Sequence, residues 1–133
     1  MLSPPKTPVR PLSPHLQIYR PQLTSVLSFA HRLSGLTLGI YSIGLVAWLL
    51  AAASGPAAYG VALRFVGSYL GQILLVAGTW CFFLHFCGGI RHLFWDAGRG
   101  LELRSIYLSG WAVMVMSTVL TAMAWIVSSA LVK

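Results

Sequence analysis

The sequence FVGSYLGQILLVAGTWCFFLHFCGGI occupies residues 65–90 and contains no Asp, Glu, Lys or Arg. It is longer than the roughly 20 apolar residues that an α-helix needs to cross the hydrocarbon core of a bilayer. Two other uncharged runs of sufficient length, residues 33–63 and 105–132, lie on either side of it. The three runs predict an all-α membrane protein with three transmembrane helices.

The overall composition supports this class. Only 8% of the 133 residues are charged, whereas a soluble domain carries about 25%. The net charge of +7 comes from sparse basic residues at the ends of the apolar runs, where membrane topology explains them better than nucleic-acid binding does. We therefore exclude a soluble globular enzyme, a disordered chain and a nucleic-acid-binding protein.

The chain divides into an amino-terminal arm, residues 1–24, and a transmembrane domain, residues 25–133. The first 21 residues contain six of the seven prolines, a density that prevents helix formation and favours an extended segment. We expect helices at about residues 25–53, 67–95 and 105–131. No short apolar core with a cleavage site precedes the first span, so a secretory signal peptide is not expected.

The distribution of Lys and Arg predicts the orientation. One side of the membrane would hold seven of them and the other side two: Lys6, Arg10, Arg20, Arg32, Arg91, Arg99 and Arg104 against Arg64 and Lys133. Since basic residues are enriched on the cytoplasmic side, the amino terminus and the second connection are expected there, or on the equivalent matrix side of an organelle.

Several other residue types suggest no catalytic role. Cys81 and Cys87 are six residues apart, do not share a helix face, and are expected to be packing residues rather than a disulfide. Asp96 and Glu102 are interpreted as solvated charges of the second connection. No nucleophile–base set, zinc spacing or phosphate loop is present, so we expect no hydrolytic chemistry.

The first predicted span has a polar face near the inner side. Ser28, His31, Arg32 and Gly35 stand at positions i, i+3, i+4 and i+7 and therefore lie close together on a helix. Taken singly, Arg32 is more simply explained as reaching the lipid head groups and Ser28 as bonding its own backbone. Three polar groups on one face favour a site.

The second span has a corresponding face, formed by Gly71, Gly78, His85, Gly89 and His92. His85 would lie about ten residues, or about 15 Å, from the inner helix end, where an unpartnered imidazole is costly. His85 is therefore either a hydrogen-bonded packing residue or a ligand of a metal ion. The glycines one and two turns away leave a flat space that suits a porphyrin.

A haem in this chain would be of the non-covalent b type, because no Cys-x-x-Cys-His motif is present. His85 and His92 share a face about 10.5 Å apart along the axis and cannot sandwich one iron, while His31 is expected near the surface. The second axial ligand should therefore come from another subunit, which would complete a haem-binding helical bundle.

The propionates of such a haem would need cations or hydrogen-bond donors at the membrane edge. His31, Arg32, Arg91 and His92 all lie toward the inner side. For Arg91 we favour extension to the lipid head groups, because it points about 100° away from the face that carries His85.

Three segments of the sequence resemble one known family. The segments are RPLSPHLQIYR (residues 10–20), SFAHRLSG (28–35) and HFCGGIRHLFWD (85–96), and together they resemble the cytochrome b556 subunits of succinate dehydrogenase. The likeness covers nearly the whole chain. It implies a membrane anchor of respiratory Complex II that pairs with a second hydrophobic anchor subunit and docks an iron–sulfur subunit and a flavoprotein subunit.

The resemblance also implies a function and site residues. Electrons from succinate, oxidised on another subunit in the tricarboxylic acid cycle, would reduce ubiquinone at the bacterial or mitochondrial inner membrane. His85 matches the axial ligand of haem b, and His31, Arg32 and His92 match its propionate partners. Ser28 and Arg32 match the quinone-site residues, Ser28 as a donor to a quinone oxygen and Arg32 as a charge that stabilises reduced, anionic forms.

Some alternatives stay open. The arm could contact the iron–sulfur subunit through Ser13, His15 and Tyr19, or it could be a surface tail. The chain could also be a haem-free scaffold that anchors a peripheral dehydrogenase, with His85 bonded to a neighbouring helix. A transporter component is disfavoured, because the sequence has neither a pair of broken helices nor an inverted repeat.

Overall fold

The computed structural model describes residues 20–131, and this part of the chain forms four α-helices. They are α1 (Leu23–Ala53), α2 (Pro56–Gly67), α3 (Tyr69–Asp96) and α4 (Leu103–Leu131). Three of them, α1, α3 and α4, are long and apolar enough to cross a membrane, which confirms the predicted all-α fold with three spans.

The structure differs from the expectation at the start of α1 and in having a fourth, shorter helix. Helix α1 begins at Leu23, so Thr24, which was expected in the arm, is helical. Residues 1–19, with the expected contact residues Ser13, His15 and Tyr19, lie outside the described range. Helix α2 was not expected at all; it follows Gly55, whose φ of 108° favours glycine, and it starts with Pro56, a residue suited to the first helical position.

A break at Ser68 separates α2 from α3. Ser68 adopts an extended conformation, with φ −70° and ψ 159°, and its hydroxyl donates to the Phe65 carbonyl at 2.6 Å. The same oxygen accepts the backbone N–H of Gly71 at 3.1 Å, while the Gln72 amide donates to the Val66 carbonyl at 2.8 Å. These local hydrogen bonds satisfy backbone groups that a helix break inside a membrane would leave unpaired.

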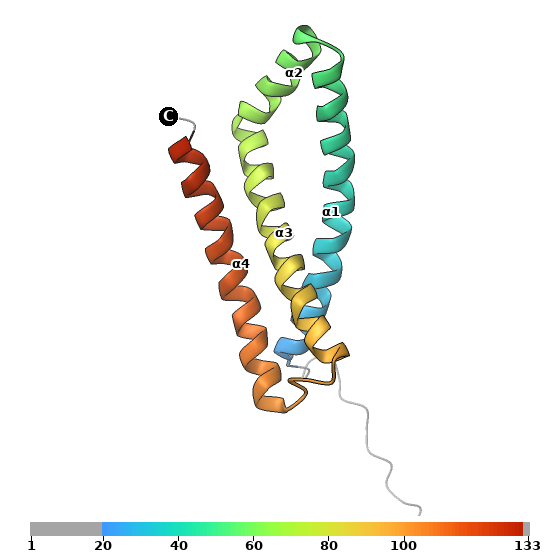
Figure 1. Ribbon diagram of the computed structural model, residues 1–133, viewed down its shortest axis with the longest axis vertical. Coiled ribbons are helices and arrows are strands. Elements are labelled where there is room, and N and C mark those ends of the chain that lie inside the picture. Colours follow the sequence, from blue (N-terminus) through green and yellow to red (C-terminus); the bar gives the residue numbers. More distant parts are fainter. Residues whose placement is uncertain (1–19, 132–133) are drawn as a thin grey trace, which may run out of the picture.

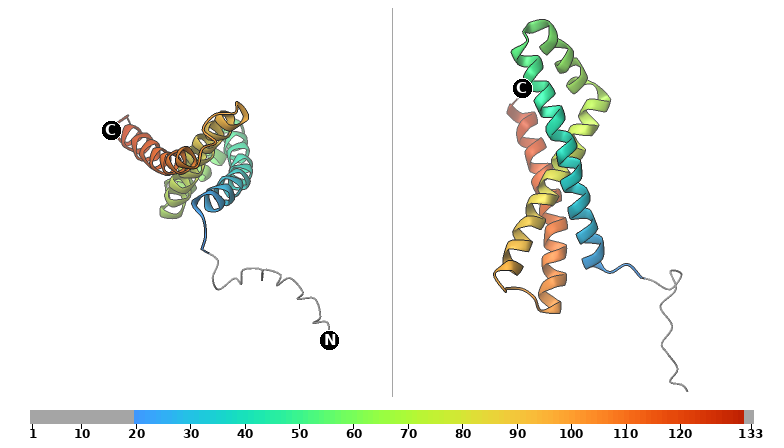
Figure 2. Two further views of the ribbon diagram at one scale, coloured as in Figure 1. Left: turned by 90° about the horizontal axis from the view of Figure 1, so that it is seen from below. Right: turned by 90° about the vertical axis from the view of Figure 1, so that its right-hand side faces the viewer.

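Helix α3 lies between α1 and α4 and packs against both (Figures 1 and 2). The start of α1, the end of α3 and the start of α4 meet at one end of the molecule, which we call the basic end because it carries Arg20, Arg99 and Arg104. The hairpin of α1 and α2 forms the opposite end. This topology brings the two predicted polar faces, on α1 and on α3, next to each other.

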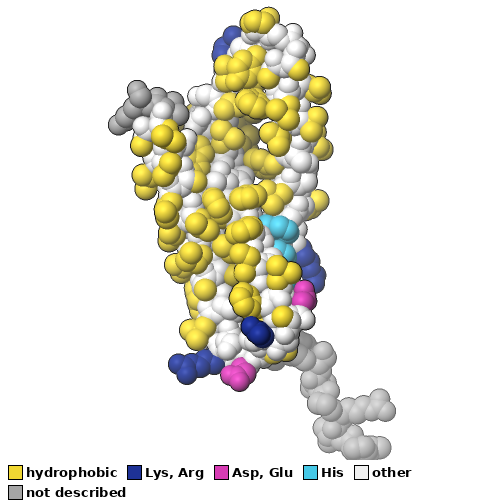
Figure 3. All heavy atoms as spheres, viewed as in Figure 1, with side chains coloured by type: hydrophobic (Ala, Val, Ile, Leu, Met, Phe, Trp, Pro, Cys, Tyr) yellow, Lys and Arg dark blue, Asp and Glu magenta, His cyan; other side chains and the backbone are white. Residues whose placement is uncertain are grey.

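Small residues make the helix contacts, and large apolar residues face outward. Ser117 of α4 is completely buried, and a Cβ on Gly110 would lie 2.8 Å from Leu27 of α1. By contrast, apolar side chains cover most of the visible outer surface (Figure 3). Without a hydrophobic driving force between helices in lipid, close backbone approach is what holds such a bundle together.

The crossing of α1 and α3 at Gly78 leads to a testable prediction. The Tyr41 ring occupies the position that a Cβ on Gly78 would take, and its hydroxyl donates to the Leu74 carbonyl at 2.6 Å, so the ring cannot move aside freely. We expect Gly78→Ala to destabilise the protein by about 1–3 kcal/mol through overpacking. The thermal unfolding midpoint of the purified protein in detergent measures this.

The matched control is Gly39→Ala, because a Cβ on Gly39 has nothing within 4 Å. This change should leave the unfolding midpoint equal to that of the unchanged protein or slightly higher, since alanine favours the helix. Equal midpoints for the two variants would contradict the packing described at Gly78.

Candidate functional site

Two histidines stack face to face where α1 and α3 approach each other. The rings of His31 and His85 have centroids 4.1 Å apart and planes that differ by 2°. His92 of α3 also packs against His31, with its centroid 5.0 Å from that of His31 and its plane tilted by 44°. Residues from the two predicted polar faces therefore form one cluster.

Two glycines make the histidine stack possible. A Cβ on Gly35 would lie 2.8 Å from Cε1 of His85, and a Cβ on Gly88 would lie 2.6 Å from Nδ1 of His31. Any larger residue at either position would displace the imidazole that lies against it or move the helices apart. Gly35 is on the predicted face, whereas Gly88 was missed because counting four residues from His85 leads to its neighbour Gly89.

The expected flat space beside His85 is only partly present. A Cβ on Gly89 would have nothing within 4 Å, so the surface one turn from His85 is open. The expectation for Gly78, two turns away, is wrong, because the Tyr41 ring fills that position. The space is thus confined to the half of α3 nearer the basic end.

The hydrogen bonds of His85 define which ring nitrogen is free. Its Nδ1 lies 3.1 Å from the His31 carbonyl oxygen and 3.3 Å from the Ser34 hydroxyl, and the Ser34 hydroxyl itself donates to the same carbonyl at 2.8 Å. A carbonyl only accepts, so we assign the proton to Nδ1. The Nε2 atom then carries the lone pair, and no described residue binds it.

This arrangement fits the axial ligand of a haem. Ligating histidines usually donate their second ring N–H to a carbonyl, which orients the ring and raises its basicity as a ligand. His85 makes such a bond through Nδ1, and Gly89 leaves open space beside it. Ser34, which is 2% exposed, supports the bond and was not singled out from the sequence, although it lies three residues after His31.

The stack corrects one step of the sequence reasoning. His31 was expected near the surface and His85 deep, but the two rings are in contact. They still cannot sandwich an iron, because parallel rings 4.1 Å apart present faces rather than nitrogens to each other. Within residues 20–131, no group of three or more His, Cys, Asp or Glu side chains could hold a metal ion.

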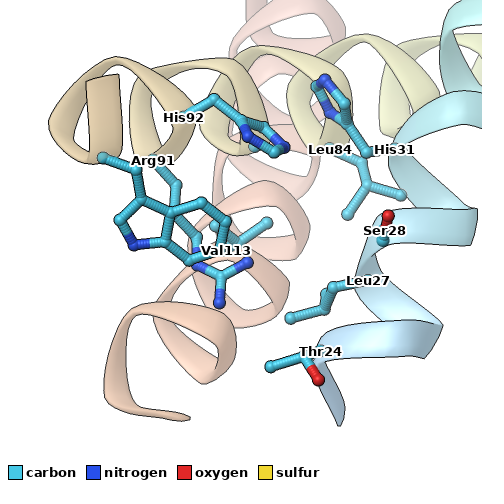
Figure 4. Close-up of a pocket in the computed structure, with 10 residues that line it drawn as sticks. Thr24, Leu27, Ser28, His31, Leu84, Arg91, His92 and Val113 are labelled. Atoms are coloured by element: carbon cyan, nitrogen blue, oxygen red, sulfur yellow. The ribbon is translucent and has the colours of Figure 1, made fainter. Parts of the chain in front are cut away.

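A small pocket opens beside the cluster, between α1, α3 and α4. Its volume is about 150 Å³. Figure 4 shows Thr24, Leu27 and Ser28 projecting from α1 on one side, and Arg91 and His92 coming from α3 on the other. His31 also lines the pocket, and the remaining walls come from apolar and aromatic side chains: Leu84, Trp95 and Val113.

Three of the five predicted site residues therefore meet in this pocket: Ser28, His31 and His92. His85 reaches it only through its contact with His31. Arg32 is exposed and does not line it. Thr24 was missed because it was placed in the arm. Trp95 was missed although it follows His92, a residue of the predicted face, by three residues.

Arg91 takes a different position from the one expected. It is only 8% exposed, so extension to the lipid head groups is wrong. Its Nε donates to the Ser109 hydroxyl at 2.9 Å, its Nη2 donates to the Ile106 carbonyl at 3.0 Å, and its guanidinium carbon lies 4.0 Å from the Trp95 ring centroid. The 100° rotation from His85 turns Arg91 toward α4, not toward lipid.

One buried atom in the site lacks a partner. Among the described residues, Nδ1 of His31 is the sole buried side-chain nitrogen or oxygen without a hydrogen bond. An unpaired N–H there would cost more than a bare lone pair, so we assign the His31 proton to Nε2. His31 thus offers a donor to a group that enters from outside the chain.

The rest of the described chain holds no comparable cluster. An open groove of about 780 Å³ between α3 and α4 has mainly apolar and aromatic walls, among them Ile73, Val76 and Trp125. Cys81 and Cys87 are free thiols, as expected. The histidine cluster and its pocket are therefore the candidate functional site.

Several known proteins are similar to this chain over most of its length. The succinate dehydrogenase cytochrome b556 subunit of Rickettsia felis is 40% identical over 117 residues, which cover 88% of this chain and 91% of that protein. The subunit of the same name from Paracoccus denitrificans is 41% identical over 118 residues, covering 89% and 91% of the two chains.

A mitochondrial protein is also similar. The succinate dehydrogenase cytochrome b560 subunit of Mus musculus is 42% identical over 115 residues, which cover 81% of this chain and 65% of that protein. Residues 6–124 match the family described as the succinate dehydrogenase/fumarate reductase transmembrane subunit. With nearly the whole chain covered, this protein belongs to the succinate dehydrogenase/fumarate reductase transmembrane subunit family.

Proposed function

We propose that this subunit carries one axial ligand of a b-type haem and forms part of the site at which a succinate dehydrogenase complex reduces ubiquinone. Membership of the family makes the chain a transmembrane part of a multi-subunit enzyme whose catalytic succinate site lies on another subunit. The observation that carries the proposal is His85, whose Nδ1 is bonded to the His31 carbonyl while Nε2 is free.

In this proposal His85 is the residue that would bind the iron, and the haem would supply a one-electron centre near the quinone site. The bond from Nδ1 to the His31 carbonyl holds the imidazole in the tautomer that ligation requires. Gly35 fixes the ring from the side of α1. The second ligand comes from a second hydrophobic anchor subunit, since no other described imidazole can face the same iron.

Three residues are proposed to hold the haem propionates: His31, Arg32 and His92. Each offers a donor or a charge to a carboxylate. His31 and His92 are in ring contact, and Arg32 is exposed, so its guanidinium is free to reach a group on the outer surface of α1. The proton assigned to Nε2 of His31 is available as a donor to an anionic group from outside the chain.

For the quinone, we propose Ser28 as a hydrogen-bond donor to one carbonyl oxygen and Arg32 as the charge that stabilises its reduced forms. Reduction of the quinone to the quinol takes two electrons, delivered by the iron–sulfur subunit, and two protons. A donor and a cation beside the oxygen favour the build-up of negative charge before protonation.

We further propose that the basic end faces the cytoplasm or the mitochondrial matrix, where the iron–sulfur and flavoprotein subunits dock. The excess of Lys and Arg at this end supports the orientation. It also brings the histidine cluster to the side from which electrons arrive. The membrane is then the bacterial or the mitochondrial inner membrane, with lipid around the exposed apolar faces.

A haem-free scaffold is the second candidate, and one observation favours it. His85 is already hydrogen-bonded to a carbonyl and stacked on His31. Its ring therefore has the partner that a half-buried imidazole needs, even without a metal. The two candidates differ in a single measurable property, the reduced-minus-oxidised absorption spectrum of the assembled complex.

We expect His85→Ala to abolish the b-type haem absorbance of the purified complex, because the variant lacks the iron ligand. Phe86→Leu changes the exposed neighbouring residue and should leave the spectrum unchanged. If the spectrum of His85→Ala equals that of the unchanged complex, the ligand assignment is wrong. If the unchanged complex has no haem absorbance, the scaffold candidate holds.

We expect Ser28→Ala and Arg32→Gln to lower ubiquinone reduction about fivefold and tenfold or more, in line with the loss of a neutral and of a charge-assisted hydrogen bond. Succinate oxidation by an artificial dye should persist, since that site is elsewhere. Ser25→Ala is the matched control, because Ser25 is exposed and outside the pocket. Loss of both activities together would indicate failed assembly and would count against the quinone role.

A further inference from the structure

Within residues 20–131, Arg91 is a buried cation that no acidic side chain contacts. It is 8% exposed, yet the sequence contains only two acidic side chains, Asp96 and Glu102, and both are exposed. Neither forms an ion pair with Arg91 among the hydrogen bonds of residues 20–131. Charges within a membrane protein pair with other charges or with backbone carbonyls and often mark a ligand site, so the buried position of Arg91 makes it a candidate for ligand binding.

The hydrogen bonds of Arg91 leave donors unused. A guanidinium has five N–H groups, and described residues accept only two of them, the Nε–H at Ser109 and one Nη2–H at Ile106. Nη1 is not among the buried atoms without a partner in the described range, so it remains accessible. Arg91 lines the pocket between α1, α3 and α4, and we take the pocket as the place where these donors are reached.

Contacts with α4 and with Trp95 hold the Arg91 guanidinium in one orientation. The bonds to Ser109 and Ile106 tie it to α4, and the Trp95 ring lies 4.0 Å from its central carbon. Stacking on an aromatic face and two hydrogen bonds reduce the freedom of a long side chain, so little entropy remains to be lost on binding a ligand. The donor is thus preorganised.

The rest of the pocket narrows the class of ligand. Its polar lining consists of groups that can donate: the hydroxyls of Thr24 and Ser28, His31 and His92, together with Arg91. Leu27, Leu84 and Val113 supply apolar walls. Its volume of about 150 Å³ matches that of a protein cavity that takes up benzene. A single six-membered ring with acceptor oxygens fits both the size and the lining.

We propose that the head ring of the quinone enters this pocket and that Arg91 donates to one of its oxygens. This inference rests on the proposed function and adds a cation to it that lies inside the pocket, whereas Arg32 lies outside. Ser28 stands on the opposite wall, on α1 (Figure 4). The positive charge of Arg91 would stabilise the reduced forms of the quinone, whose oxygens become more negative as the ring gains electrons.

The first test uses Arg91→Gln in the complete complex, with a short-chain ubiquinone as the probe. Loss of a charge-assisted hydrogen bond should raise the KM for the quinone at least about tenfold, while dye-linked succinate oxidation and the haem spectrum stay unchanged. Arg99→Gln is the charge control, because Arg99 is exposed in the connection between α3 and α4; it should leave the KM within about twofold. An unchanged KM for Arg91→Gln overturns the proposal.

A second variant tests the pocket without changing Arg91, in case Arg91→Gln does not assemble. Val113→Phe places a ring in the pocket from the α4 wall, where Val113 is 7% exposed. It should compete with the quinone head and raise the KM about tenfold or more. Ser109→Ala removes the partner of Nε and one restraint on the guanidinium but leaves the charge in place, so it should raise the KM less than Arg91→Gln does.

The outcomes separate this inference from the proposed function. If Val113→Phe and Arg91→Gln both leave the KM unchanged while Ser28→Ala raises it, the quinone lies elsewhere and only the inference fails. If the unchanged complex does not reduce ubiquinone at all, the proposed function fails first. If Ser109→Ala destroys assembly as fully as Arg91→Gln does and Val113→Phe has no effect, Arg91 only joins α3 to α4.

Discussion

The close approach of α1 and α3 at Gly35 and Gly88 is the contact on which the site depends. Each glycine lies against the imidazole of the other helix at a distance that no Cβ would allow. This close packing lets His31 and His85 stack in parallel. In lipid, helices gain little from burying apolar surface against each other, so such close backbone contacts have a large share in positioning them. The same contact brings the His31 carbonyl within reach of Nδ1 of His85.

Helix α4 completes the site by a different kind of interaction. It offers hydrogen-bond acceptors to Arg91 at Ser109 and Ile106, and its small residues allow it to pack on α3, with Ser117 completely buried. Arg91 contacts Trp95, Trp95 lies edge-on to His92, and His92 contacts His31. The proposed haem ligand and the proposed quinone pocket are therefore linked through a continuous set of side-chain contacts.

The sequence predicted the three spans because long uncharged runs leave few alternatives to transmembrane helices. It also predicted which residues would share a face, since helical periodicity is simple to count. The prediction failed where the result depends on how two helices meet. Gly88 and Gly89 both lie about one turn from His85, and the sequence does not show which of them contacts α1. Nor does it show that Tyr41 fills the space at Gly78. Helix α2 was missed because most of it, residues 56–63, lies within the same uncharged run as α1, and only Gly55 and Pro56 mark its start.

The error about Arg91 has the same origin and is the most instructive. An arginine near the end of a span is usually free to reach the head groups, and its 100° rotation from His85 argued against a shared site. That rotation is correct, but α4 lies in that direction and supplies two acceptors. A single helix seen in isolation has only a lipid-facing side and a site-facing side. The third helix adds another environment, in which a charge is buried yet hydrogen-bonded and its remaining donors are left for the pocket that Arg91 lines.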